Sequence, residues 1–236
     1  MKNTQTASRF MKILLGVTAM LITVTGIAFR QSFINILPLY ISLFVSLMQS
    51  RVNRIAYLIG AANSILYAIV YIHFKLYASA VYAVLFSCFL QLATYFLWSS
   101  RSFGKATVFR AMKGWQRAIL ATGFVVAWTI VWFILPATDS VHRIFDISSS
   151  LLGMLNTVLT MLAFIEYVPL MILGQFVNIG LYISMLRDNP AQITYLIYAL
   201  FSLSCQILAL KKVLFLYRQQ NAQKIRNTIK NKKEDI

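Results

Sequence analysis

Residues 63–67 read NSILY and residues 178–182 read NIGLY, and the same offset of 115 residues aligns LFSCFLQ at 85–91 with LFSLSCQ at 200–206. Seven residues are identical in these 29 ungapped positions, among them an asparagine, a tyrosine and a glutamine. Leucine and phenylalanine match readily by chance in an apolar sequence, whereas polar residues at equal spacing do not. The stretch therefore indicates an internal repeat.

The rest of the chain is strongly apolar. Hydrophobic residues make up 59% of the 236 residues and charged residues only 12%, compared with about 25% charged residues in a soluble domain. Polar backbone groups need internal partners in a bilayer, and a helix of about 20 apolar residues crosses the hydrocarbon layer. We therefore predict an all-α polytopic membrane protein with about eight transmembrane helices, near residues 12–29, 33–49, 55–73, 76–98, 118–136, 144–162, 167–186 and 193–210.

The net charge of +16 comes from basic residues that lie mainly on one side of the predicted membrane. If the N-terminus lies in the cytoplasm, 18 lysines and arginines fall on the cytoplasmic side of the predicted helices and four on the outside. Membrane proteins show this positive-inside bias, so no nucleic-acid partner is needed to explain the charge. We predict a multi-pass protein of the inner (plasma) membrane with both termini in the cytoplasm. The first run resembles a signal peptide, but no clear cleavage site follows it, so we expect a retained helix.

The repeat pairs the third and fourth apolar runs with the seventh and eighth. Equivalent helices are four apart, an even number, so both copies have the same orientation in the membrane. Parallel repeats of this kind are related by an axis along the membrane normal, as in SWEET-type transporters. We predict a parallel 3+1+3 repeat with one extra N-terminal helix. The predicted segments are the extra helix (1–30), the first three-helix repeat (31–99), a basic loop and connector helix (100–137), the second three-helix repeat (138–212) and a basic cytoplasmic tail (213–236).

Polar side chains in the repeated helices are candidates for ligand binding, because polar groups at mid-depth in a membrane face the interior of the bundle. Amides and phenols can contact the donors and acceptors of a neutral heterocycle or sugar. The predicted substrate-binding residues are Asn63, Tyr67, Gln91, Gln175, Asn178 and Tyr182. The alternative is that these groups only form hydrogen bonds between helices, and this alternative is favoured for Asn178 and Gln206.

Several classes of function lack their sequence signals. None of the six acidic residues lies at mid-depth in a predicted helix, where a proton-coupled transporter usually has one. The sequence has no Walker loop, HExxH motif or paired CxxC motif, so we expect no enzyme activity, no metal and no cofactor. Cys88 and Cys205 lie in apolar runs and are expected to stay reduced. We predict a facilitative transporter, with the lipid bilayer and a small-molecule substrate as its partners. The alternative is an accessory or sensor subunit that docks a partner through its basic tail.

The repeat motifs also resemble those of a known family. Gly60-x-x-Asn63-x-x-x-Tyr67, followed by Lys75-Leu76-Tyr77 and by Gln91 with Trp98 seven residues later, is similar to the first repeat of the PnuC-type nicotinamide riboside transporters. The second repeat is similar in outline, and the resemblance covers roughly residues 40–212. It implies a full-length relative of the SWEET fold that moves an unphosphorylated, vitamin-like nucleoside by facilitated diffusion. It further implies a cytoplasmic kinase that traps the product. A homo-oligomer of such units is compatible with the sequence.

One motif of the family is absent. Its second repeat carries Trp-x-x-Trp-x-x-x-Asn, and the resemblance implies that the tryptophans stack on the nicotinamide ring. This chain has Val168, Met171 and Gln175 at those positions. Stacking of a base on an aromatic ring is worth about 1–3 kcal/mol, so the loss of both rings keeps another nucleoside or thiamine open as the substrate.

Overall fold

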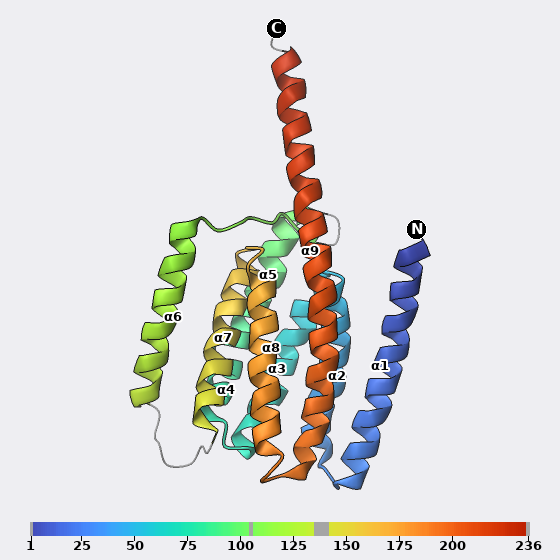
Figure 1. The fold of residues 1–236 in the computed structure, drawn as a ribbon, viewed down its shortest axis with the longest axis vertical. Coiled ribbons are helices and arrows are strands. Elements are labelled where there is room, and N and C mark those ends of the chain that lie inside the picture. The colour runs from blue at the N-terminus through green and yellow to red at the C-terminus, as the bar shows by residue number, and fades with distance from the viewer. Residues whose placement is uncertain (1, 104–105, 135–141, 235–236) are drawn as a thin grey trace.

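The computed structural model describes residues 2–103, 106–134 and 142–234, and these residues are almost entirely helical (Figure 1). In this part of the chain, eight helices are long and apolar enough to cross a membrane, which confirms the predicted number. They are α1 (Lys2–Ala28), α2 (Phe33–Ser50), α3 (Ile55–His73), the continuous span α4–η1–α5 (Tyr77–Ser100), α6 (Gly114–Ile134), α7 (Arg143–Met161), α8 (Tyr167–Met185) and α9 (Ile193–Glu234).

The fourth span changes its helical type along its length. It begins as α4 (Tyr77–Val81), continues as the π-helix η1 (Tyr82–Ser87) and ends as α5 (Cys88–Ser100). A short 3-10 helix, η2 (Pro190–Gln192), leads into α9. The strands β1 (Ser102–Phe103) and β2 (Ala106–Thr107) form a small hairpin after α5.

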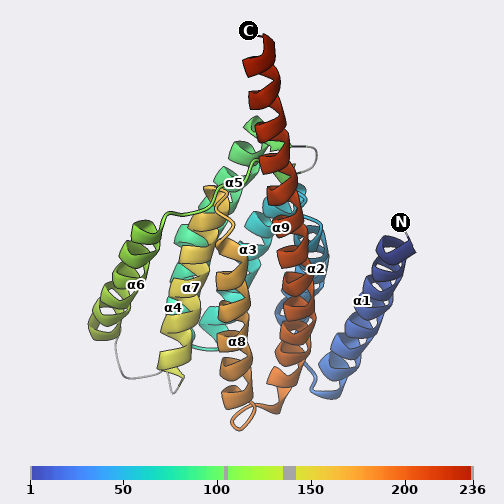
Figure 2. The ribbon, with the colours of Figure 1, turned by 45° about the horizontal axis from the view of Figure 1, so that its top comes forward.

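Six of the spans pack into a ring (Figure 2), and the contacts between them follow the repeat. In the first repeat α2 packs on α3 and α3 packs on α5, and in the second repeat α7 packs on α8 and α8 packs on α9. The two halves meet where α2 contacts α9 and where α5 contacts α7. These two junctions are equivalent under the repeat. The contacts therefore agree with a parallel 3+1+3 arrangement about an axis along the bundle.

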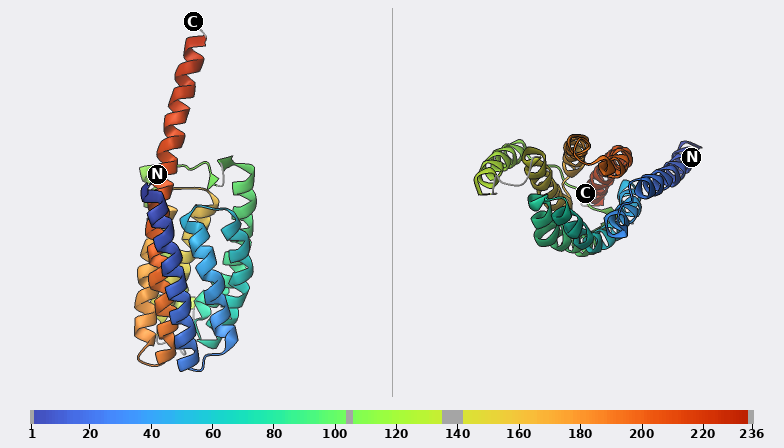
Figure 3. Two further views of the ribbon diagram at one scale, coloured as in Figure 1. Left: turned by 90° about the vertical axis from the view of Figure 1, so that its right-hand side faces the viewer. Right: turned by 90° about the horizontal axis from the view of Figure 1, so that it is seen from below.

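The two remaining spans, α1 and α6, lie on opposite flanks of the ring (Figure 3). Helix α1 packs on α9 and α2, and α6 packs on α7. No residue of α6 is buried, so most of its surface is left for lipid. It is attached to α7 through Trp128, whose Nε1 donates to Ser148 Oγ at 3.1 Å.

Two apolar cores close the ring at its two ends. We call the end that carries the loop after α5 and the extension of α9 the basic end. The basic-end core contains Val52, Tyr57, Trp98, Phe109, Tyr167 and Val168. The opposite-end core contains Val70, Leu76, Leu181, Tyr182, Met185 and Tyr195. The residues named here leave the middle of the ring for a polar site.

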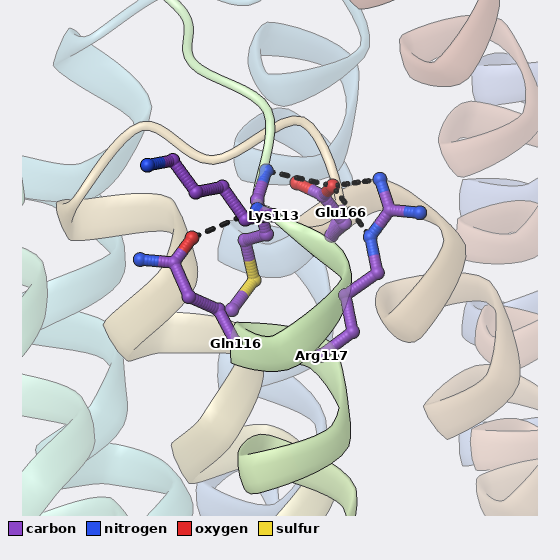
Figure 4. Close-up of polar contacts among 5 residues, drawn as sticks. Lys113, Gln116, Arg117 and Glu166 are labelled. Carbon is purple, nitrogen blue, oxygen red and sulfur yellow. Dashed lines mark hydrogen bonds and ion pairs between the residues drawn. The ribbon is translucent and has the colours of Figure 1, made fainter.

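The loop between α5 and α6 is fastened across the basic end. Arg110 N donates to Ala163 O at 2.9 Å and Ile165 N donates to Arg110 O at 2.9 Å, so the loop pairs with the turn between α7 and α8. Glu166 in that turn accepts from Met112 N at 3.0 Å and pairs with Arg117 Nη2 at 2.7 Å (Figure 4). These contacts attach the described part of the loop, residues 106–113, to the turn between α7 and α8.

Helix α9 is longer than the sequence indicates. The last apolar run ends near residue 210, whereas the helix continues to Glu234. At a rise of 1.5 Å per residue, its 42 residues span about 63 Å. Gln220 on the extension accepts from Phe109 N and donates to Thr107 O, both at 2.9 Å. These contacts with the loop support the helix beyond the apolar segment.

Candidate functional site

A polar cavity of about 230 Å³ lies inside the six-helix ring. By a comparable measure a single water needs roughly 10–15 Å³, so the cavity has room for a small molecule. Its lining comes from α2, α3, the fourth span, α7, α8 and α9, and none of the described residues of α1 or α6 contributes. The site thus belongs to both repeats.

Asn63 on α3 is fixed against α2. Its side chain is 4% exposed, and its Nδ2 donates to Pro38 O at 3.0 Å and to Ser42 Oγ at 2.8 Å. The Ser42 hydroxyl in turn donates to Tyr67 Oη at 3.0 Å. Both N–H groups of the amide are used within the protein, which leaves Asn63 Oδ1 as a buried acceptor without a partner among the described residues.

The π-helix turns three polar residues of the fourth span toward the cavity. Tyr82 and Ser87 are its first and last residues, and Gln91 follows one turn later. Tyr82 Oη lies 2.9 Å from Thr157 Oγ1 on α7, and its ring occupies the space beside Gly153, where a Cβ would be only 2.9 Å from the ring. An added residue in a helical turn changes which side chains share a face, and π-helical turns often occur at functional sites.

The second repeat contributes a pair of buried amides. Gln206 Nε2 on α9 donates to Gln175 Oε1 on α8 at 3.1 Å and to Ser202 Oγ at 3.2 Å. Gln175 Nε2 donates to Ala199 O at 3.1 Å. Gln206 Oε1 is buried without a partner in the described part of the chain. This oxygen is therefore in the same situation as Asn63 Oδ1.

The lining as a whole is polar and uncharged. It contains five tyrosines, Tyr57, Tyr67, Tyr82, Tyr167 and Tyr198, and six side-chain amides, Gln49, Asn63, Gln91, Asn156, Gln175 and Gln206. Among the described residues, no Asp, Glu, Lys, Arg or His lines the cavity. Buried polar atoms are nearly always hydrogen-bonded, so the unpartnered oxygens of Asn63, Asn156 and Gln206 point to water or a ligand with N–H or O–H groups.

Tyrosines lie where the cavity meets the two apolar cores. Tyr57 and Tyr167 line the cavity and also belong to the basic-end core, with the Trp98 ring 4.9 Å from that of Tyr57. Tyr67 lines the cavity and packs on the opposite-end core. The cavity is therefore bracketed by packed aromatic side chains in both directions along the bundle.

The sequence-predicted site residues divide into two groups. Asn63, Tyr67, Gln91 and Gln175 lie on the cavity wall. Asn178 and Tyr182 do not: Asn178 Oδ1 accepts from Ser149 Oγ at 2.5 Å, and Tyr182 is buried in the opposite-end core with its ring 5.6 Å from that of Tyr195. Helical spacing placed the second-repeat residues on one face, but packing turns two of them toward neighbouring helices.

Other lining residues were not named as candidates. Gln206 was assigned to helix packing, although it is the repeat counterpart of Gln91. Asn156, Thr157 and Thr160 line the cavity from α7, and their spacing of one to four residues would have indicated a polar face. The sequence does not show which tyrosines line the cavity, because in an apolar sequence a tyrosine is as compatible with the core as with a binding site.

The buried carboxylate Asp146 lies outside the cavity lining. It is 1% exposed and accepts from Ala78 N and Ser79 N, both at 3.1 Å, and from the Ser79 hydroxyl at 2.5 Å. These donors belong to the first turn of the fourth span, whose N–H groups need acceptors. Asp146 therefore fastens α7 to α4. In the part of the chain that the structure describes, no three His, Cys, Asp or Glu residues form a group able to hold a metal ion.

Two larger hollows, of about 530 and 440 Å³, flank α6. The first lies between α6, the fourth span and α7, and the second between α6, α7 and α8; apolar side chains form nearly all of their lining. Both lie at the periphery of the bundle, where lipid surrounds a membrane protein. The polar cavity is accordingly the better candidate site.

Known proteins resemble this chain in sequence pattern and in fold. A family model described as "Nicotinamide mononucleotide transporter" matches residues 32–211. A solved structure described as "Crystal structure of the Vitamin B3 transporter PnuC" superimposes with a TM-score of 0.77 at 17% sequence identity, and covers 90% of this chain and 92% of that chain. At this identity the similarity shows the fold. No curated protein matches the sequence.

Proposed function

This chain belongs to the nicotinamide mononucleotide transporter family, and we propose that it is a facilitator for a phosphate-free, vitamin-like nucleoside, with nicotinamide riboside as the first candidate. The observation that carries this proposal is the uncharged cavity, lined by amides, hydroxyls and tyrosines, inside the six-helix ring. Such groups suit the hydroxyls of a ribose and the edge of a carboxamide. Tyrosine faces and amide oxygens also suit a cationic pyridinium ring.

The cavity favours the riboside over the mononucleotide named in the family's description. A phosphate monoester carries about −1.5 to −2 charges at neutral pH, and burial of such a charge is costly without a cationic partner. No lysine, arginine or histidine of the described residues lines the cavity. We therefore expect the phosphate group to exclude the mononucleotide.

The proposed mechanism is facilitated diffusion with the substrate enclosed between two closures. The basic-end core and the opposite-end core bracket the cavity, and each must loosen in turn for a molecule to pass. The protein would lie in the inner membrane with its basic end and both termini in the cytoplasm, as the distribution of lysine and arginine favours. A cytoplasmic kinase would then trap the product, and another nucleoside or thiamine remains the alternative substrate.

A binding and uptake experiment tests this function. The melting temperature of the purified protein is measured with nicotinamide riboside, nicotinamide mononucleotide, a panel of other nucleosides, and thiamine. A ligand at 100 times its dissociation constant stabilises the native state by about 2.7 kcal/mol. We expect nicotinamide riboside to raise the melting temperature and to enter proteoliposomes, and the mononucleotide to do neither. Stabilisation by none of these compounds would instead favour an accessory or sensor subunit.

A further inference from the structure

Gly60 and Gln91 are in unusually close contact. Gly60 is buried on α3 and lines the cavity, and a Cβ placed on it would lie 2.0 Å from Gln91 Oε1 and 3.1 Å from Gln91 Cδ. The amide of Gln91 therefore rests directly on the backbone of α3. Any other residue at position 60 would displace this amide.

Two serines fix the orientation of the same amide. Gln91 Nε2 donates to Ser87 Oγ at 2.7 Å and to Ser64 Oγ at 3.1 Å, and the two serine hydroxyls lie 2.8 Å apart. Both N–H groups are therefore used, and the carbonyl oxygen is directed toward Gly60. No described residue donates a side-chain or backbone hydrogen bond to Gln91 Oε1. This oxygen lies beside the cavity and can accept a hydrogen bond from another molecule.

The second repeat fills the corresponding space. The residue equivalent to Gly60 at the offset of 115 is Gln175, and the residue equivalent to Gln91 is Gln206. Here the two side chains bond to each other, with Gln206 Nε2 3.1 Å from Gln175 Oε1. The two halves of the cavity are thus related in sequence but differ in shape. The Gln91 oxygen of the first repeat packs on the backbone of Gly60, whereas the equivalent Gln206 in the second repeat is bonded to Gln175.

We propose that Gly60 positions Gln91 for substrate binding, because the missing side chain at position 60 lets the Gln91 carbonyl oxygen lie where it can accept a hydrogen bond from an N–H or O–H group of the transported molecule. The inference rests on the proposed function, since it assumes that a nucleoside-like molecule occupies the cavity. Gly60 acts through Gln91 and is a positioning residue. Its effect on binding should therefore disappear when the Gln91 amide is absent.

A double-mutant cycle tests this dependence. Nicotinamide riboside is titrated calorimetrically into the wild type, Gly60→Ala, Gln91→Ala and the double variant, and each melting temperature is recorded without ligand. Loss of one well-placed hydrogen bond lowers affinity by roughly tenfold, so we expect a loss of at least this size in each single variant. The double variant should bind no more weakly than Gln91→Ala, because contacting residues are not additive. Gly123→Ala on α6, where an added Cβ meets nothing within 4 Å, is the matched control.

The melting temperatures separate binding from folding. If the added methyl group of Gly60→Ala unfolds the protein, removal of the Gln91 amide in the double variant should restore the melting temperature, which supports the contact. A double variant that stays unfolded would show that Gly60 is needed for packing alone and would overturn the inference. Unchanged affinity in Gly60→Ala, or losses that multiply in the double variant, would also overturn it. If the wild type does not bind nicotinamide riboside but another compound of the panel stabilises it, the same cycle is measured with that compound. Stabilisation by none of the compounds means that the proposed function fails, and this inference fails with it.

Discussion

Asn178 Oδ1 on α8 accepts a hydrogen bond from Ser149 Oγ on α7 at 2.5 Å, and this bond connects two helices of the second repeat outside the cavity lining. Its repeat counterpart, Asn63, contacts Pro38 and Ser42 of the first repeat and does line the cavity. The repeat therefore places one asparagine on the cavity wall and its counterpart in a contact between two helices.

These two asparagines give a matched pair of variants. Asn63→Ala should weaken binding of nicotinamide riboside by roughly tenfold, the effect of one lost hydrogen bond in a buried site, whereas Asn178→Ala should leave the affinity unchanged. Both should lower the stability slightly, because hydrogen bonds between membrane helices average about 0.6 kcal/mol. Calorimetric titration beside a melting curve makes the comparison. Equal affinity in both variants would remove Asn63 from the binding site.

Transport should need no ion gradient. Asp146 is fastened to the N-terminus of α4, Glu166 is paired with Arg117, and no described carboxylate lines the cavity. Uptake into proteoliposomes is thus expected to stop when the concentrations inside and outside are equal, with or without a proton or sodium gradient. Accumulation that depends on one of these gradients would contradict facilitated diffusion and would suggest an ion site built from neutral oxygens.

Labelling of single cysteines can test the orientation in the membrane. Lys113, directly before α6, and Arg187, in the turn after α8, are both exposed. The start of α6 and the end of α8 lie at opposite ends of the bundle (Figure 1). In a variant with Cys88 and Cys205 replaced by alanine, a membrane-impermeant maleimide should label Arg187→Cys in intact cells. Lys113→Cys should react only after the membrane is opened. The reverse pattern would place both termini outside.

Removal of Arg117 and removal of Glu166 should lower the stability of the protein by different amounts, although both break the same ion pair. Arg117 is 58% exposed, and exposed ion pairs are worth about 0.2–1 kcal/mol, so Arg117→Ala is expected to have a small effect. Glu166→Ala also removes the acceptor of Met112 N, which is partly buried, and a donor left without a partner there should cost about 1 kcal/mol, the lower end of the range for unpaired buried groups. The melting temperature should fall further for Glu166→Ala. Equal melting temperatures in the two variants would show that the loop is held by other contacts.

The sequence was sufficient to predict the eight transmembrane spans and the internal repeat. The thickness of the bilayer sets the length of an apolar helix, and so the eight spans agree with the apolar runs within a few residues except at the two ends of the chain. The π-helix at Tyr82–Ser87 was not predictable, because it contains no Gly or Pro to mark a change of helical type. The structure of the loop after α5 was not predictable either, since its partners, such as Ala163 and Gln220, are more than 50 residues away in the chain.

The candidate site was predictable to the extent that helical periodicity determines it. Asn63 and Tyr67 lie four residues apart and both line the cavity. In the second repeat the same spacing holds for Asn178 and Tyr182, but Tyr182 packs against Tyr195 in the opposite-end core. Spacing shows which residues share a face of a helix, and the neighbouring helices decide what that face contacts.

The absent tryptophan pair leads to a final prediction about substrate preference. Met171 lines the cavity, whereas Val168 is fully buried in the basic-end core. Val168→Trp should therefore overpack that core and cost about 1–3 kcal/mol of stability. Met171→Trp should place a ring where an aromatic base can stack, which is worth about 1–3 kcal/mol, or roughly a tenfold gain in affinity for nicotinamide riboside.

Met171→Leu is the control for this substitution, because it changes the shape of the side chain without adding a ring. Free ribose is the control ligand, because it has hydroxyl groups and no base to stack. We expect calorimetric titration to show tighter binding of nicotinamide riboside to Met171→Trp alone, and no gain for ribose in either variant. Weaker binding of nicotinamide riboside to Met171→Trp would mean that the new ring fills the space of the substrate.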